Sequence, residues 1–228
     1  MVMVGVQIKI CGVASHDELV LLDEARIDYA GIWFGIPESA RSLDRRAFHA
    51  LVTCPMAHVR CVAVTTQSDP EQIADFVTGC RVPALQVHGF LLPGAVRTLR
   101  SLVGDCVEIF KVLHVHGDTC LEGALLPQYM SHGGADAFII DRFASRGRIG
   151  SSGEPVPRAA VERIIDAVGA QRVLLAGGMS EPGIREARSR LGVRGVDVDS
   201  AARDGDARRQ LSALRVRALA AAAHEALS

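Results

Sequence analysis

Short apolar runs, each followed by a longer stretch with helical spacing, recur eight times along this sequence. The runs are nearly continuous in apolar residues, as expected of parallel strands that other elements cover on both faces. The predicted strands are residues 6–11, 29–34, 59–65, 84–87, 107–113, 137–141, 172–176 and 195–199. Such alternation indicates an α/β fold, either a closed (β/α)8 barrel or a large doubly wound sheet. We expect the barrel, the TIM-barrel fold, which suits a chain of 228 residues.

The stretches between the predicted strands carry apolar residues three and four positions apart, which is the spacing of amphipathic helices. The clearest are residues 17–25, 70–78, 94–103 and 159–168, and an alanine-rich stretch over 207–227 predicts a closing helix. Helix start signals are Ser15, the Asp69-Pro70 pair and the Glu181-Pro182 pair. No linker or low-complexity tract interrupts the pattern, so we predict one domain over residues 1–228.

The composition excludes several classes of partner. Apolar residues make up 49% of the chain but aromatic residues only 4%, so the core must consist of branched aliphatic residues and alanine. The net charge is −1 with interspersed signs, which gives no footprint for nucleic acid or for an anionic membrane. No apolar stretch approaches the ~20 residues that span a bilayer. The first residues lack the pattern of a secretory signal.

The six cysteines are scattered without a CxxC pair, so neither a disulfide framework nor a zinc site is expected. Most of them are interpreted as small buried apolar residues of a protein in the reducing cytoplasm. His114 and His116 alternate after the fifth predicted strand and could share a metal, but the sequence positions no third ligand. We therefore predict no metal. The oligomeric state cannot be read from the sequence.

Functional side chains of such a barrel lie at the C-terminal ends of the strands. The residues at these ends are Cys11, Phe34, Thr65, His88, Leu113, Asp141, Gly177, Gly178, Asp199 and Ser200. Cys11 and Asp141 among them make a plausible base and acid. Tyr29, Trp33 and Phe34 on the second strand are interpreted as core residues, with Trp33 or Phe34 as alternative lining of the barrel mouth.

Each of these candidates also has a structural interpretation. A thiol that acts as a base needs a cationic surrounding, and Lys9 points to the same side of the strand as Cys11. Alternatively, Cys11 is a buried core residue. Asp141 ends an apolar strand, either as an acid or base or as the cap of the next loop. Gly177 and Gly178 precede a predicted helix and would let backbone N–H groups approach an anion such as phosphate, or they only form a tight turn.

Several motifs in order along the chain resemble the phosphoribosylanthranilate isomerase family of tryptophan biosynthesis. The matching pieces are Lys9-Ile10-Cys11-Gly12, Ser39-Ala40-Arg41, Gln86-Val87-His88-Gly89, Lys111, Asp141, residues 175–178 and residues 195–198. The first and third of these motifs together are specific, although either alone is weak. The resemblance covers essentially the whole length.

The resemblance implies a cytoplasmic enzyme without cofactor that performs the Amadori rearrangement of N-(5′-phosphoribosyl)anthranilate. In this view Asp141 protonates the furanose ring oxygen, and Cys11 removes the proton from C2. Arg41 would hold the anthranilate carboxylate, a task suited to its planar, permanently charged fork. The other implied substrate-binding residues are Lys9, Gln86, His88, Gly177, Gly178 and Ser200.

The motifs depart from the family in three stretches. Phe90-Leu91 stands where the family has an acidic pair, residues 150–154 end in Glu154 instead of lysine, and the loop over 199–203 starts with Asp199. A carboxylate about 5 Å from a phosphate costs about 3 kcal/mol per unit charge at an effective dielectric constant of ~20. Ala201 would also be unfavourable at a position that requires a positive φ. Arg203 or the arginines at 142, 146 and 148 could compensate the charge.

Two further hypotheses follow from these departures. One is a barrel enzyme of the same ancestry that acts on a different carboxylated or aromatic substrate, in which the phosphate is missing or altered. The other is a catalytically inactive homologue that serves as a binding partner. The first hypothesis predicts no turnover of the phosphoribosyl substrate by well-folded protein.

Overall fold

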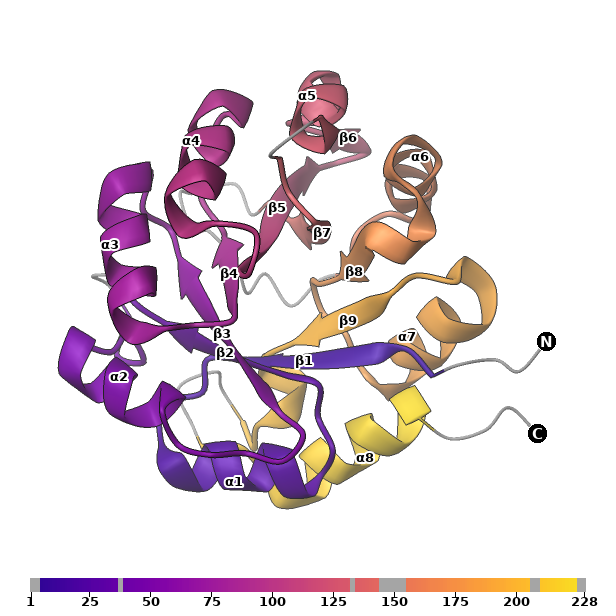
Figure 1. The fold of residues 1–228 in the computed structure, drawn as a ribbon. Helices are drawn as coiled ribbons and strands as arrows, with labels where there is room; N and C mark the ends of the chain where they lie inside the picture. Colours follow the sequence, from indigo (N-terminus) through magenta and orange to yellow (C-terminus); the bar gives the residue numbers. More distant parts are fainter. Residues whose placement is uncertain (1–4, 37–38, 132–133, 144–154, 206–209, 225–228) are drawn as a thin grey trace.

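The computed structural model describes residues 5–36, 39–131, 134–143, 155–205 and 210–224 of the chain. Within them, parallel strands form a closed barrel inside a ring of helices (Figure 1). The strands are β1 (Gln7–Cys11), β2 (Tyr29–Trp33), β3 (Arg60–Thr65), β4 (Ala84–Val87), β5 (Glu108–His116), β7 (Ala137–Arg142), β8 (Val173–Leu175) and β9 (Gly195–Val198). They follow one another in chain order, and the pairing of β9 with β1 closes the barrel. The predicted (β/α)8 fold is confirmed.

The helices cover the outer face of the strands, with α8 beside α1 where the ring closes (Figure 1). They are α1 (His16–Glu24), α2 (Arg45–Val52), α3 (Pro70–Cys80), α4 (Pro93–Val103), α5 (Leu126–Met130), α6 (Arg158–Val168), α7 (Glu181–Glu186) and α8 (Ala213–His224). Two predicted start signals are confirmed as caps, since the side chains of Ser15 and Asp69 accept hydrogen bonds from backbone N–H groups of α1 and α3. None of the helices in the described part of the chain has the length and apolar character needed to cross a membrane.

Alternation along the strands divides the core into two layers. One set of side chains fills the barrel interior, and the other packs between the strands and the helices. The apolar members of the interior set are Cys11, Tyr29, Val62, Val64, Ala84, Phe110, Val112, Ala137, Ile139, Leu174 and Ala176. Most of these are aliphatic, which agrees with the composition.

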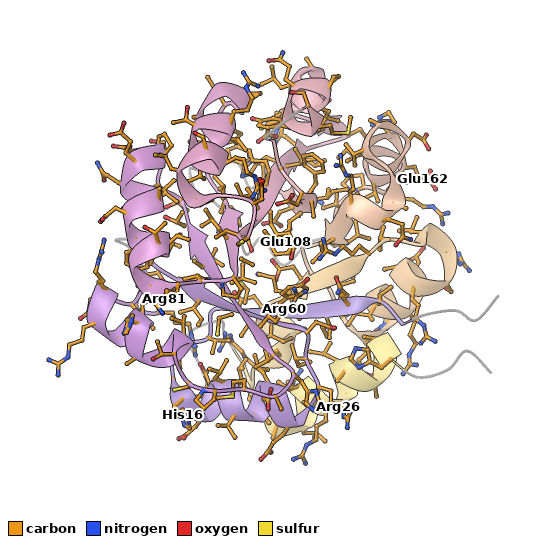
Figure 2. All side chains as sticks on the ribbon, viewed as in Figure 1. His16, Arg26, Arg60, Arg81, Glu108 and Glu162 are labelled. Carbon is orange, nitrogen blue, oxygen red and sulfur yellow. The ribbon has the colours of Figure 1, made fainter. Side chains whose placement is uncertain are left out.

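A polar cluster closes the N-terminal end of the barrel. The hydroxyl of Tyr29 accepts a hydrogen bond from Arg194 at 2.7 Å, and Arg194 also pairs with Glu108 at 2.6 Å. Arg60 joins the same cluster, and the labelled Arg60 and Glu108 lie near the middle of the ring of strands in Figure 2. This end of the barrel therefore contributes to stability, and the functional site is expected at the C-terminal ends of the strands.

The largest differences from the sequence-based expectation lie at the end of β5 and at the start of α8. β5 continues to His116 instead of ending at residue 113, because the short strand β6 (Thr119–Cys120) turns back and pairs with Val115 and His116. The closing helix was expected from residue 207, but in the described residues α8 begins at Ala213. Leu211 forms a β-bridge with Arg203 just before it.

Candidate active site

A cavity lies at the C-terminal ends of the strands, where the sequence predicted functional residues. Its lining includes Cys11 of β1, Trp33 of β2, Thr66, His88, Asp141 of β7, and the loops after β8 and β9. The predicted site residues in this lining are Cys11, His88, Asp141, Gly177, Gly178 and Ser200. Lys9, Gln86 and Arg41 are not part of the lining. Lys9 contacts Asp197 and Gln86 contacts His88 of the lining, whereas Arg41 contacts Gly12, the residue after Cys11.

Cys11 lies on the wall of the cavity above a buried ion pair. Lys9, two residues earlier on the same face of β1, is fully buried, and its Nζ atom lies 2.8 Å from Oδ1 of Asp197 on β9. The indole Nε1–H of Trp33 donates a hydrogen bond to the Sγ atom of Cys11 at 3.0 Å. The thiol is therefore held between a cation from one side and a neutral donor from another.

The surroundings of Cys11 keep the thiol protonated in the unliganded barrel. Burial raises the pKa of Cys11 to about 11, and the carboxylates of Asp197 and Asp199 add to this effect. Lys9 and the hydrogen bond from Trp33 act in the opposite direction. A proton-abstracting thiolate thus forms only when a further favourable charge or contact is present.

Asp141 faces the cavity at the end of β7 and is also almost fully buried. Its Oδ1 atom accepts a hydrogen bond from the backbone N–H of Arg142 at 2.8 Å, and its Oδ2 atom lies 3.5 Å from Nε2 of His88. Nδ1 of His88 lies 3.2 Å from the amide nitrogen of Gln86, which can only donate. When Gln86 donates to Nδ1, Nε2 is the ring nitrogen of His88 that carries a proton toward the carboxylate of Asp141.

The loops after β8 and β9 form the end of the cavity at which a phosphate is expected. Gly177 and Gly178 both have positive φ angles, 78° and 61°, a conformation that favours glycine. Ser200 begins a short 3-10 helix, Ser200–Ala202, which also contains Ala201. Ala201 does not have a positive φ, so the strain expected from its replacement of glycine is absent.

The charge of Asp199 at this end is compensated within the protein. Nε of Arg203 lies 3.0 Å from Oδ1 of Asp199, and the Arg203 side chain is fully buried. Its Nη2 atom donates to the carbonyl oxygens of Cys11 and Gly12 at 2.8 and 3.0 Å. Arg203 therefore joins the β9 loop to the end of β1. Arg142, another of the arginines expected to compensate this charge, donates from Nη1 to the carbonyl oxygen of Pro155 at 3.0 Å. The arginines at 146 and 148, and residues 150–154 with Glu154, lie outside the described residues.

Arg41 belongs to the same charged network. Its Nη1 atom donates to the carbonyl oxygen of Gly12 at 2.6 Å and lies 3.2 Å from Glu18 of α1. Glu18 also pairs with Arg203 at 3.4 Å. The carboxylate thus lies between two arginines and fixes the loop that follows Cys11.

Comparison of the chain with models of known protein families shows the enzyme family to which it belongs. The model of the N-(5′-phosphoribosyl)anthranilate (PRA) isomerase family matches residues 8–205. The chain belongs to the PRA isomerase family. The resemblance inferred from its motifs is thereby confirmed.

Relatives and solved structures agree with this assignment. The chain is 26% identical over 197 residues to an N-(5′-phosphoribosyl)anthranilate isomerase of Acetivibrio thermocellus, with 85% of each chain covered. The crystal structure of the phosphoribosyl anthranilate isomerase of Thermotoga maritima has a TM-score of 0.78 at 20% identity and covers 96% of this chain and 98% of that one. Another solved isomerase, in complex with reduced 1-(o-carboxyphenylamino)-1-deoxyribulose 5-phosphate, has a TM-score of 0.74 at 19% identity, with 96% and 98% covered.

The alternating histidines do not form a metal site in the described part of this PRA isomerase family member. His114 is buried and its Nδ1 atom lies 2.6 Å from Glu122, whereas His116 is exposed at the end of β5. No group of three metal-ligating side chains occurs among the described residues. The prediction of no metal was made from the missing third ligand and stays a prediction.

The sequence left two interpretations of Trp33 open, and the structure bears out the one in which it lines the barrel mouth, where it contacts Cys11. Two other residues that shape the PRA isomerase site were missed. Asp197 was read as part of an apolar strand, although alternation from Asp199 places it on the inner face. Glu18 was not identified, because no local signal connects it with Arg41 or Arg203.

Proposed function

We propose that Asp141 is the general acid and Cys11 the general base of the PRA isomerase reaction. As a member of the family, the chain is a phosphoribosylanthranilate isomerase, an aldose–ketose isomerase. Asp141 protonates the furanose ring oxygen, the C1–O bond breaks, and the nitrogen lone pair forms an iminium cation. Cys11 then removes the proton from C2, and the resulting enolamine tautomerises to the ketone. These steps move only protons and electron pairs, so the account needs no metal or cofactor.

The observation that carries this proposal is the placement of the two groups. Cys11 on β1 and Asp141 on β7 face one cavity from strands that β8 and β9 separate. An acid and a base that face the same substrate from different sides can act on different atoms of it. The iminium cation formed in the first step also supplies the positive charge that favours loss of the buried thiol proton.

The two ends of the substrate are assigned to the two loop regions. We assign the phosphate to the backbone N–H groups near Gly177 and Gly178 and to Ser200, where Arg203 already compensates Asp199. We assign the anthranilate carboxylate to Arg41, for which it would compete with Glu18. In this assignment Lys9 acts through Cys11, and Gln86 and His88 act through Asp141, without touching the substrate ends.

The place of this activity in the cell follows from its substrate. A phosphorylated intermediate of tryptophan biosynthesis is kept inside the cell by its charge, so a cytoplasmic location is part of the proposal. The small-molecule substrate is the one partner that the proposal requires.

Turnover of freshly generated N-(5′-phosphoribosyl)anthranilate by the wild-type protein tests the proposed function. The loss of anthranilate-type fluorescence measures the rate, and chromatography identifies the 1-deoxyribulose product. We expect turnover, and we expect the 5′-dephosphorylated substrate to react with a higher KM. Folded protein that does not convert the phosphorylated substrate would contradict the assignment and favour a barrel that acts on another substrate.

A further inference from the structure

The single tryptophan of the chain, Trp33, lies at the end of β2 against the proposed base. Its indole N–H points at the Sγ atom of Cys11, and the two heavy atoms are 3.0 Å apart. Both side chains line the cavity, so the contact is made at the reacting atom. We infer that Trp33 is a positioning residue of the isomerase reaction, which holds the Cys11 sulfur and stabilises it as a thiolate. The inference rests on the proposed role of Cys11 as the base.

The alternation of β2 explains how the indole reaches the sulfur. Gly31 is in register with Cys11, and a Cβ atom at Gly31 would come within 3.0 Å of Sγ. The missing side chain leaves space in which the thiol lies over β2. Trp33 is the next residue on the same face of this strand, so its ring covers the sulfur from the side of the cavity mouth.

The chemistry of the contact favours the anion. An indole N–H can donate but not accept, and a thiolate accepts a hydrogen bond far better than a thiol does. Charge-assisted hydrogen bonds are about twice as strong as neutral ones. Burial raises the pKa of Cys11, and the hydrogen bond from Trp33 lowers it. The contact thus strengthens when the thiol loses its proton, which is the state that can remove a proton from C2.

The ionisable groups around Cys11 explain why a neutral donor matters here. Those that face it from the packed elements are Lys9 on β1, Asp197 and Asp199 from β9, Arg203 beyond β9, and His88 and Asp141 across the cavity. Lys9 pairs with Asp197 at 2.8 Å and Arg203 with Asp199 at 3.0 Å. Each cation is matched by a carboxylate, so the Trp33 donor favours the thiolate without requiring another positive charge.

The fluorescence of the single tryptophan gives a direct readout in the unliganded protein. A thiolate quenches a neighbouring indole more strongly than a thiol does. We expect the emission of Trp33 to fall as the pH is raised through the titration of Cys11, near pH 11. The same step should be absent from Cys11→Ser, with circular dichroism used to confirm that both proteins stay folded. Identical curves for the two proteins would overturn the inference.

Alkylation by iodoacetamide measures the thiolate in variants of Trp33. Because the chain has six cysteines, the modified Cys11 peptide is quantified by mass spectrometry. Trp33→Phe should raise the pH midpoint by about one unit, which is about tenfold less thiolate at a fixed lower pH. Trp33→His retains a ring N–H, so its pH midpoint should lie between those of the wild type and Trp33→Phe. Val64→Ala changes a neighbouring cavity wall without a hydrogen bond and should keep the wild-type midpoint.

These outcomes separate the inference from the proposed function. At neutral pH, Trp33→Phe should lose about tenfold in kcat and keep its affinity for reduced 1-(o-carboxyphenylamino)-1-deoxyribulose 5-phosphate. An unchanged alkylation midpoint in Trp33→Phe would mean that Trp33 only lines the cavity and does not stabilise the thiolate, which would overturn the inference. Failure of the wild-type protein to convert its substrate would contradict the proposed function alone, because the fluorescence and alkylation measurements need no turnover.

Discussion

Lys9 and Asp197 form an ion pair of 2.8 Å in the barrel interior, one step below Cys11 on the inner face of β1. Burial lowers the pKa of Lys9, but Asp197 and the neighbouring Cys11 outweigh it and raise this pKa above its ordinary value. Burial raises the pKa of Asp197 in spite of Lys9. The two side chains hold each other charged in an apolar interior, 188 residues apart in the sequence.

Replacement of one partner of this pair should be far more costly than replacement of both. Lys9→Met leaves the Asp197 carboxylate buried without a cation, which should lower the free energy of unfolding by about 3–5 kcal/mol. The double variant Lys9→Met/Asp197→Leu should recover much of that loss. Urea denaturation of the three proteins measures the difference. A single variant as stable as the double variant would show that the pair is not desolvated as described.

Gly31→Ala should disrupt the site while leaving the barrel folded. The new Cβ atom would lie 2.9 Å from Nζ of Lys9 and 3.0 Å from Sγ of Cys11, so both side chains must move. A displacement of this kind should lower kcat by about 100-fold. Gly94→Ala in α4 is the matched control, because its nearest neighbour would be Arg97 at 4.0 Å. Equal turnover in the two variants would mean that the thiol needs no space over β2.

Arg203→Met should weaken binding of the phosphorylated substrate. The variant removes the buried cation that pairs with Asp199 near the proposed phosphate site, which should raise KM at least about tenfold. Arg203→Met/Asp199→Asn should bring KM back, because the two variants lose the same contacts to β1 and differ only in the Asp199 charge. Steady-state kinetics with the phosphorylated and dephosphorylated substrates measures the effect. A KM that stays high in the double variant would assign Arg203 a purely structural role.

The stability of the protein should fall in alkaline solution because of a cysteine outside the site. Burial, and to a lesser extent Cys54, raises the pKa of Cys61 from its ordinary value of 9.0 to about 11. In the unfolded chain this thiol ionises first, so its contribution to stability is complete below pH 9 and is lost as the pH rises toward 11. The difference in free energy of unfolding between wild type and Cys61→Ala should therefore shrink by about 2 kcal/mol between pH 9 and pH 11. Denaturation at several pH values measures it, and a constant difference would contradict the assigned burial.

The sequence predicted the barrel well because its signals are local. Each strand is a nearly continuous apolar run, and Ser15 and Asp69 mark helix starts by contacts within a few residues. The hairpin of β5 and β6 was missed because β6 has only two residues, and a tight turn separates it from β5. Two residues are too few to show the alternation of apolar and polar side chains that indicates a strand.

The site was predicted only in part, because several of its contacts join residues that are far apart in the sequence. Cys11 and Asp141 were identified because the ends of barrel strands converge on one cavity. Lys9, which tunes Cys11 from the same strand, was also identified, but the partners from β2 and β9 were not, because nothing near Trp33 or Asp197 in the sequence indicates their contacts with it. Arg203 was one of four arginines that could compensate Asp199, and the sequence did not indicate the buried ion pair by which it does so.

The turnover of Cys11→Ala and Asp141→Asn tests the central claim most directly. Freshly generated N-(5′-phosphoribosyl)anthranilate is the substrate, and binding of the reduced product analogue shows that each variant keeps a formed site. The account predicts that each substitution lowers kcat at least ~100-fold with the fold and the affinity for the analogue retained. Wild-type turnover in either variant would contradict the assignment of these two residues as base and acid.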